Sequence, residues 1–172
     1  EGVDCTLELY PYPTGSSFPL SFLPSYAHEG GPDAIMERMK NPSERVRLIE
    51  HLEASQARPL NEAVFTYLGK NKDLEGMSLP DVAAEKGSSL AETLLDLLIE
   101  EDGQICYRGA PPESVKTWQQ ISRDCVELLS RPDYMVGSDA IPIGSLPHPR
   151  AYEIGPRLLC RPRPRFPFLP PH

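Results

Sequence analysis

YMVGSDAIPIGSLPHPRAY, residues 134–152, is a short apolar run that ends in a polar turn and continues into a loop with a histidine and an arginine. The stretch before it, PESVKTWQQISRDCVELLSRP (112–132), has apolar residues at helical spacing, namely Trp118, Ile121, Cys125 and Leu128. A helix that leads directly into a strand is the repeating unit of parallel α/β folds. The stretch therefore predicts this architecture, with Asp139 at the end of a strand.

The rest of the chain alternates strands and helices in the same way. Strands are predicted at the start of VDCTLELYPYPTGSS (3–17), in EAVFTYLG (62–69), in QICYRG (104–109) and in YMVGSD (134–139). Helices are predicted in NPSERVRLIEHLEA (41–54), SLPDVAAEKG (78–87) and SSLAETLLDLLIEEDG (88–103), with N-caps at Asn41, Ser78 and Ser89. The expected core-facing residues of the first and third are Val46, Ile49, Leu52, Leu90, Leu94, Leu97 and Leu98. We expect an α/β fold with parallel strands.

Composition narrows the class of protein. The chain has 172 residues, 40% of them apolar and 24% charged, which suits one globular domain. A net charge of -8 argues against nucleic acid as a partner, and the absence of a long apolar run argues against a membrane-spanning helix. The four cysteines show no C-x-x-C spacing, so we expect free thiols in a cytoplasmic setting rather than a zinc cluster or a disulfide framework.

Five polar residues near predicted strand ends are candidates for chemistry. Asp139 is placed to carry a proton or bind a metal, or simply to cap the following segment. Arg150 suits bidentate recognition of a carboxylate, or a surface ion pair, and His148 is a candidate ligand or a backbone-bonded loop residue. Tyr10 and Ser16 are placed to donate hydrogen bonds to an oxyanion or a carboxylate, or else they simply form part of a turn.

Residues 161–172, RPRPRFPFLPPH, differ in composition from the rest of the chain. Five prolines in this stretch exclude a helix and favour an extended or disordered tail. Overlapping P-x-x-P steps beside arginines also suit an SH3-type ligand. We therefore set the tail apart from residues 1–160.

Several blocks together resemble a known family. ELYPYPTGSS, then LPSYAHEGG, then YMVGSDAIP, PHPRAY and PRLL are similar in order and spacing to the N-acyl-D-amino-acid deacylases (D-aminoacylases) of the amidohydrolase superfamily. The resemblance implies a partial (β/α)8 TIM barrel of the amidohydrolase type over residues 1–160. It also implies hydrolysis of non-peptide C–N amide bonds in a small N-acyl amino acid or related amide.

The resemblance also implies roles for individual residues. Asp139 corresponds to the catalytic acid/base near zinc, and Arg150 to the residue that binds the substrate carboxylate. Tyr10 and Ser16 correspond to residues that contact the scissile group and the carboxylate, and His148 stands in the same substrate-binding block.

The chain also departs from the family. It lacks the H-x-H ligands, and EIGPR replaces a G-T-F-P-R block. Apart from Asp139, the zinc ligands are absent, and the start without methionine suggests a fragment that is inactive alone. Two alternatives follow: one chain of a split enzyme, completed by a missing half or a second copy, and a non-catalytic interaction module.

Overall fold

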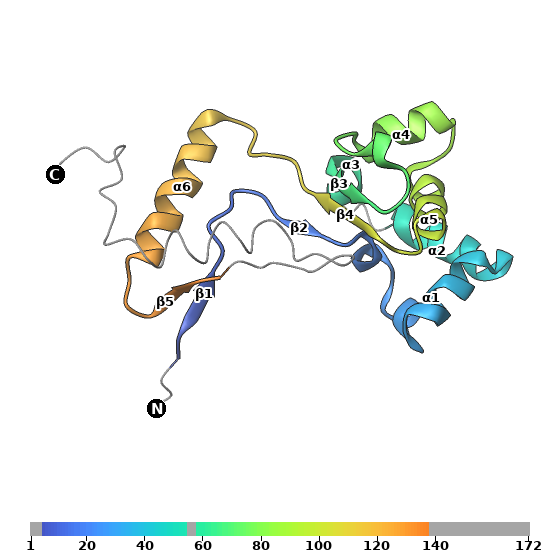
Figure 1. The fold of residues 1–172 in the computed structure, drawn as a ribbon, viewed down its shortest axis with the longest axis horizontal. Helices are drawn as coiled ribbons and strands as arrows, with labels where there is room; N and C mark the ends of the chain where they lie inside the picture. Colours follow the sequence, from blue (N-terminus) through green and yellow to red (C-terminus); the bar gives the residue numbers. More distant parts are fainter. Residues whose placement is uncertain (1–4, 55–57, 138–172) are drawn as a thin grey trace. The chain divides into compact units, whose positions relative to one another are not determined.

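The computed structural model of the chain describes residues 5–54 and 58–137 (Figure 1). These residues form two compact units. Unit 1 contains residues 5–12 and 119–137, and unit 2 contains residues 13–118. Both helices and strands are present, so the predicted α/β class is confirmed.

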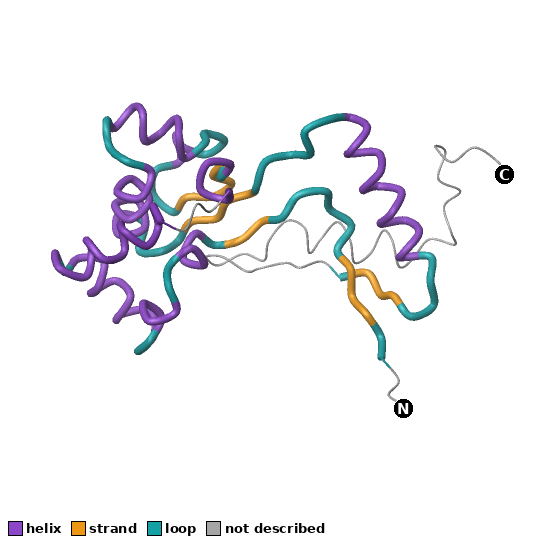
Figure 2. Tube along the Cα trace, turned by 180° about the vertical axis from the view of Figure 1, so that it is seen from behind, coloured by secondary structure: helices purple, strands orange, loops and turns teal. Residues whose placement is uncertain are grey.

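Unit 1 is built on a pair of parallel strands, β1 (Leu7–Leu9) and β5 (Tyr134–Val136), which lie side by side in Figure 2. In the register Glu8 is opposite Met135. The chain reaches β5 through α6 (Val115–Leu129), whose residues from Gln119 onward belong to this unit. The predicted helix and the predicted strand after it are therefore confirmed, and the parallel strands that were predicted are present in this pair.

Unit 2 contains a three-stranded sheet in the order β2-β4-β3, formed by β2 (Ser16–Ser17), β4 (Ile105–Arg108) and β3 (Val64–Leu68). Both pairings are antiparallel, so the prediction of parallel strands is wrong for this sheet. The connection from β3 to β4 contains two helices joined by a short turn, α4 (Leu79–Lys86) and α5 (Leu90–Glu100). Two successive helices bring the chain back to the carboxyl end of β3, so β4 runs antiparallel to it. A single crossover helix would bring the chain back to the amino end of β3 and make the two strands parallel.

The other described helical segments of unit 2 are three 3-10 helices and three α-helices. They are η1 (Pro19–Phe22), η2 (Ser25–His28), α1 (Gly31–Lys40), α2 (Pro42–Ala54), α3 (Arg58–Glu62) and η3 (Lys72–Leu74). The sequence analysis did not predict α1. Gly30 and Gly31 both have positive φ, of 87° and 82°, so the chain turns sharply at the start of this helix.

The core of unit 2 is centred on α5, which packs against α1, α2 and α4 (Figure 1). Leu94, Leu97 and Leu98 are buried as predicted, and Leu90 is partly buried against the same cluster. Ser89 and Glu92 form the predicted capping box at the start of α5. The helix is thus specified both by its apolar face and by its first turn.

The apolar stripe of α2 differs from the prediction by one position. Leu48 and Leu52 are buried and Ile49 packs against the core, but Val46 is 55% exposed. Leu48 and Leu52 are four residues apart and share a helix face, while Val46 is rotated away from it. The Asn41 cap is confirmed, since its Oδ1 accepts hydrogen bonds from the Ser43 and Glu44 backbone N–H groups at 3.0 and 3.2 Å.

Helix α6 contrasts with α5 because none of its residues is buried. Its predicted apolar face is half-buried at Ile121, Cys125 and Leu128, and Trp118 is 45% exposed. Among the described helices there is none whose length and apolar content would let it cross a membrane.

Candidate functional site

The parallel pairing of unit 1 brings two polar strand ends to one edge. Tyr10 follows β1 directly and Gly137 follows β5 directly. The Gly137 N–H donates a hydrogen bond to the Leu9 carbonyl at 3.0 Å, which extends the pairing beyond the strands. Functional residues of parallel α/β proteins lie at this carboxyl edge. The edge beyond Leu9 and Val136 is therefore the candidate site.

Tyr10 is half-buried at this edge, beside a second tyrosine. The rings of Tyr10 and Tyr12 lie 5.9 Å apart, tilted by 32°. Alternate residues of an extended chain share one side, so Tyr10 lies on the same side of β1 as Glu8. The predicted position of Tyr10 at a strand end is confirmed, while its contact with a substrate stays a prediction.

Glu8 is a member of this edge that the sequence analysis missed. It is exposed, and its carboxyl group occupies the space that a side chain at position 137 would need. A Cβ atom at that position would lie 2.5 Å from both Cγ and Cδ of Glu8. A charged residue inside an apolar strand, two positions before Tyr10, was the signal that could have found it.

Three of the predicted site residues, Asp139, His148 and Arg150, lie outside the described residues. Their predicted roles stay predictions.

Ser16 belongs to unit 2, whereas Tyr10 belongs to unit 1. Ser16 opens β2 and its Oγ donates a hydrogen bond to the Tyr107 carbonyl at 3.0 Å. In the loop just before it, the Thr14 hydroxyl bonds the Gly109 carbonyl at 3.1 Å. A hydroxyl has one proton to donate, so Ser16 would have to leave Tyr107 before it could donate to an oxyanion.

Zinc coordination finds no support among the side chains that the structure places. Within residues 5–54 and 58–137 there is no group of three or more His, Cys, Asp or Glu residues able to hold a metal ion. Three protein ligands are the usual minimum of a catalytic zinc site. The described residues therefore do not fit the zinc that the resemblance implies.

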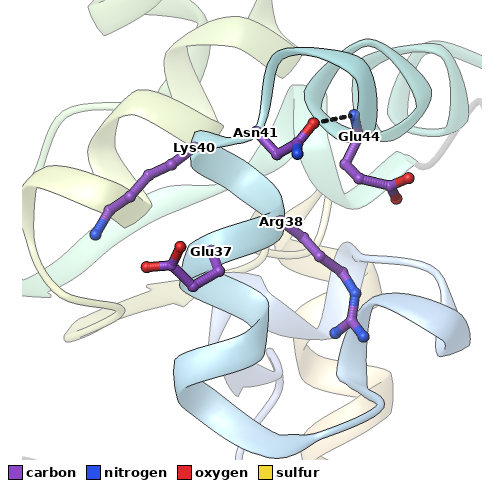
Figure 3. Close-up of a pocket in the computed structure, with 5 residues that line it drawn as sticks. All are labelled: Glu37, Arg38, Lys40, Asn41 and Glu44. Atoms are coloured by element: carbon purple, nitrogen blue, oxygen red, sulfur yellow. Dashed lines mark hydrogen bonds between the residues drawn. The ribbon is translucent and has the colours of Figure 1, made fainter.

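A shallow pocket of about 320 Å³ at the junction of α1 and α2 is lined by Glu37, Arg38, Lys40, Asn41 and Glu44. In Figure 3 the Arg38 and Lys40 side chains extend in opposite directions, so the two cations do not converge. Arg38 donates hydrogen bonds to the Ala27 and Glu29 carbonyls at 2.9 and 2.5 Å. Arg38 and Asn41 therefore hold the local fold.

Glu101 is the most unusual ionisable group of unit 2. It is 1% exposed and accepts hydrogen bonds from the backbone N–H groups of Lys70 and Asn71 at 2.6 and 2.8 Å, and from Asn71 Nδ2 at 2.6 Å. Burial by itself raises the pKa of the Glu101 carboxyl, but these hydrogen bonds outweigh it and hold the pKa below its ordinary value. All of its described partners belong to the turn after β3, so its role is structural.

Comparison with known proteins does not test the family resemblance, which stays a prediction. No family model, no curated protein and no solved structure matches this chain.

Proposed function

We propose that this chain carries substrate-binding and proton-transfer residues of a hydrolase that cleaves C–N bonds in N-acyl-D-amino acids or related amides. The observation that supports the proposal most is the parallel pairing of β1 with β5. The two sequence blocks that carry the family resemblance, around Tyr10 and around Asp139, each contain the carboxyl end of one of these two strands. A substrate at that edge would reach both blocks.

The proposal gives each residue a separate task. Tyr10 donates a hydrogen bond to the amide carbonyl or the carboxylate of the substrate. Asp139 takes a proton from the attacking water and passes it to the leaving amine. Arg150 binds the substrate carboxylate through two parallel hydrogen bonds, with His148 beside it. The zinc implied by the resemblance would need ligands beyond the described residues, so no step here depends on it.

The proposal extends to the fold and the cellular setting. β1 and β5, the parallel strands of unit 1, are proposed as neighbouring strands of a partial (β/α)8 barrel, of which the antiparallel sheet of unit 2 is no part. A cytoplasmic location is proposed from the state of the thiols: Cys5, Cys106 and Cys125 are all free, which suits a reducing compartment.

Binding of N-acetyl-D-leucine to the 172-residue chain tests the proposal, measured by isothermal titration calorimetry. Two matched ligands serve as controls. N-acetyl-L-leucine differs from N-acetyl-D-leucine only in chirality, and N-acetyl-D-leucinamide differs from it only in having a neutral amide in place of the carboxylate. We expect the D-acid to bind best and Arg150→Ala to remove its advantage over the amide. Tyr10→Phe should weaken binding about fivefold, the effect of one lost hydrogen bond. Tyr67→Phe, in β3 of unit 2, is the control. Equal affinity for all three ligands would contradict the proposal.

A second candidate function, binding of another polypeptide, is favoured by the exposed apolar side chains of unit 1. Leu7 is 47% exposed and Met135 is 52% exposed, although parallel strands are normally covered on both faces. We expect self-association in analytical ultracentrifugation that Met135→Lys abolishes. Val46→Lys is the matched control, because Val46 is 55% exposed in unit 2. A monomer at every concentration would count against association between copies.

A further inference from the structure

The side chain of Glu8, in β1, leaves no room for a side chain at position 137, which is a glycine. Its φ is not in the left-handed region, so the backbone conformation there would tolerate a side chain. The obstacle is Glu8, whose carboxyl group and Cγ fill the space next to the glycine. Glycine at this point therefore serves the close approach of a side chain from the neighbouring strand.

The register of the two strands explains why Glu8 reaches this point. Glu8 is opposite Met135, and Gly137 is two residues further along on the same face of β5. Leu9 accepts the hydrogen bond from the Gly137 N–H at 3.0 Å. Backbone pairing through Leu9 and side-chain packing through Glu8 thus act on the same glycine.

We propose that Glu8 is a positioning residue for the carboxyl end of β5. Its side chain packs on the Gly137 backbone and holds this strand end against β1. The role assigned to Asp139 rests on the proposed function, whereas the packing of Glu8 on Gly137 does not.

The size of the Glu8 side chain carries the effect. Glu8→Gln keeps the shape of the side chain and should behave like the wild type, whereas Glu8→Ala removes the contact. Gly137→Ala introduces the overlap with Glu8 and should disturb the end of β5 only while Glu8 is present. Glu85→Ala, at an exposed position of α4, is the control for loss of one negative charge.

A double-mutant cycle with two readouts tests the proposal on the full chain. The first readout is the exchange rate of the Gly137 amide, measured by NMR. We expect Glu8→Ala and Gly137→Ala each to raise this rate about tenfold, and the double variant to add little more, as is typical of residues in contact. The second is the Kd of N-acetyl-D-leucine, which Glu8→Ala should raise about tenfold and Glu8→Gln should leave within about twofold. Thermal unfolding by circular dichroism confirms that each variant folds, with Glu8→Ser as a second truncation.

The outcomes separate this inference from the proposed function. The positioning role would be overturned by an exchange rate of the Gly137 amide that Glu8→Ala leaves unchanged. It would also be overturned if Gly137→Ala changed the exchange rate at position 137 equally with and without Glu8. If Glu8→Gln changed the amide exchange rate or the Kd as much as Glu8→Ala does, the claim that the shape of the Glu8 side chain is responsible would be overturned. If the amide responds as expected but the wild type binds no N-acetyl-D-leucine, Glu8 keeps its positioning role and the proposed function fails.

Discussion

Replacing Glu101 by glutamine should destabilise unit 2 by about 3 kcal/mol at neutral pH. The carboxylate has Oε2 opposite the Lys70 N–H at 2.6 Å and Oε1 opposite the Asn71 N–H at 2.8 Å and its Nδ2 at 2.6 Å. A glutamine has only one acceptor oxygen, so its NH2 group would face a donor on one side. A hydrogen bond to a charged group is worth about 1.5–3 kcal/mol, and the remaining bonds become neutral and weaker.

The charge of Glu101 also gives the prediction a pH dependence. Its pKa in the folded chain lies below the ordinary value of 4.5. The carboxyl therefore contributes stability that is fully present above pH 4.5 and is lost as the pH falls through the lower, folded pKa. Because Glu101→Gln cannot ionise, the difference in stability between wild type and variant should shrink below pH 4.5.

Urea denaturation followed by circular dichroism at 222 nm measures both effects, at pH 7 and again in acid. Glu85→Gln is the matched control, since Glu85 is exposed on α4 and makes no described hydrogen bond, and it should change stability by less than about 0.5 kcal/mol. A Glu101→Gln variant as stable as this control at pH 7 would refute the reasoning. A difference from the wild type that does not shrink in acid would refute the assigned charge state.

Three further predictions concern single side chains and the metal. Ser16→Ala should lower the free energy of unfolding by about 1 kcal/mol, through loss of the bond to Tyr107, and leave the affinity for N-acetyl-D-leucine unchanged; weaker binding would place Ser16 in the site after all. Ser89→Ala should destabilise the chain by about 1 kcal/mol in urea denaturation because the capping box of α5 is lost, and an unchanged midpoint would contradict this. Purified chain should contain well under one equivalent of zinc by mass spectrometry and release no acetate from N-acetyl-D-leucine; stoichiometric zinc with turnover would contradict this.

Local signals in the sequence predicted much of unit 2. The cap at Asn41, the capping box at Ser89 and the leucine stripe of α5 depend on residues close together in the chain, and each is present in the structure. The strands that became β3, β4 and β5 were likewise visible from their apolar runs and turn residues. The direction of β4 was not, because it depends on how two successive helices return the chain.

By itself the sequence determined most of the longer helices and strands, although not α1, and it pointed to Tyr10 and Asp139 as residues that follow strands. Only the tertiary structure decided that β1 and β5 pair in parallel, across most of the chain, so that Tyr10 and Gly137 share an edge. It also separated Ser16 from Tyr10 into different units and placed Glu8 against Gly137. Propensity, capping and periodicity act over a few residues, whereas strand pairing and close packing join residues that are distant in sequence.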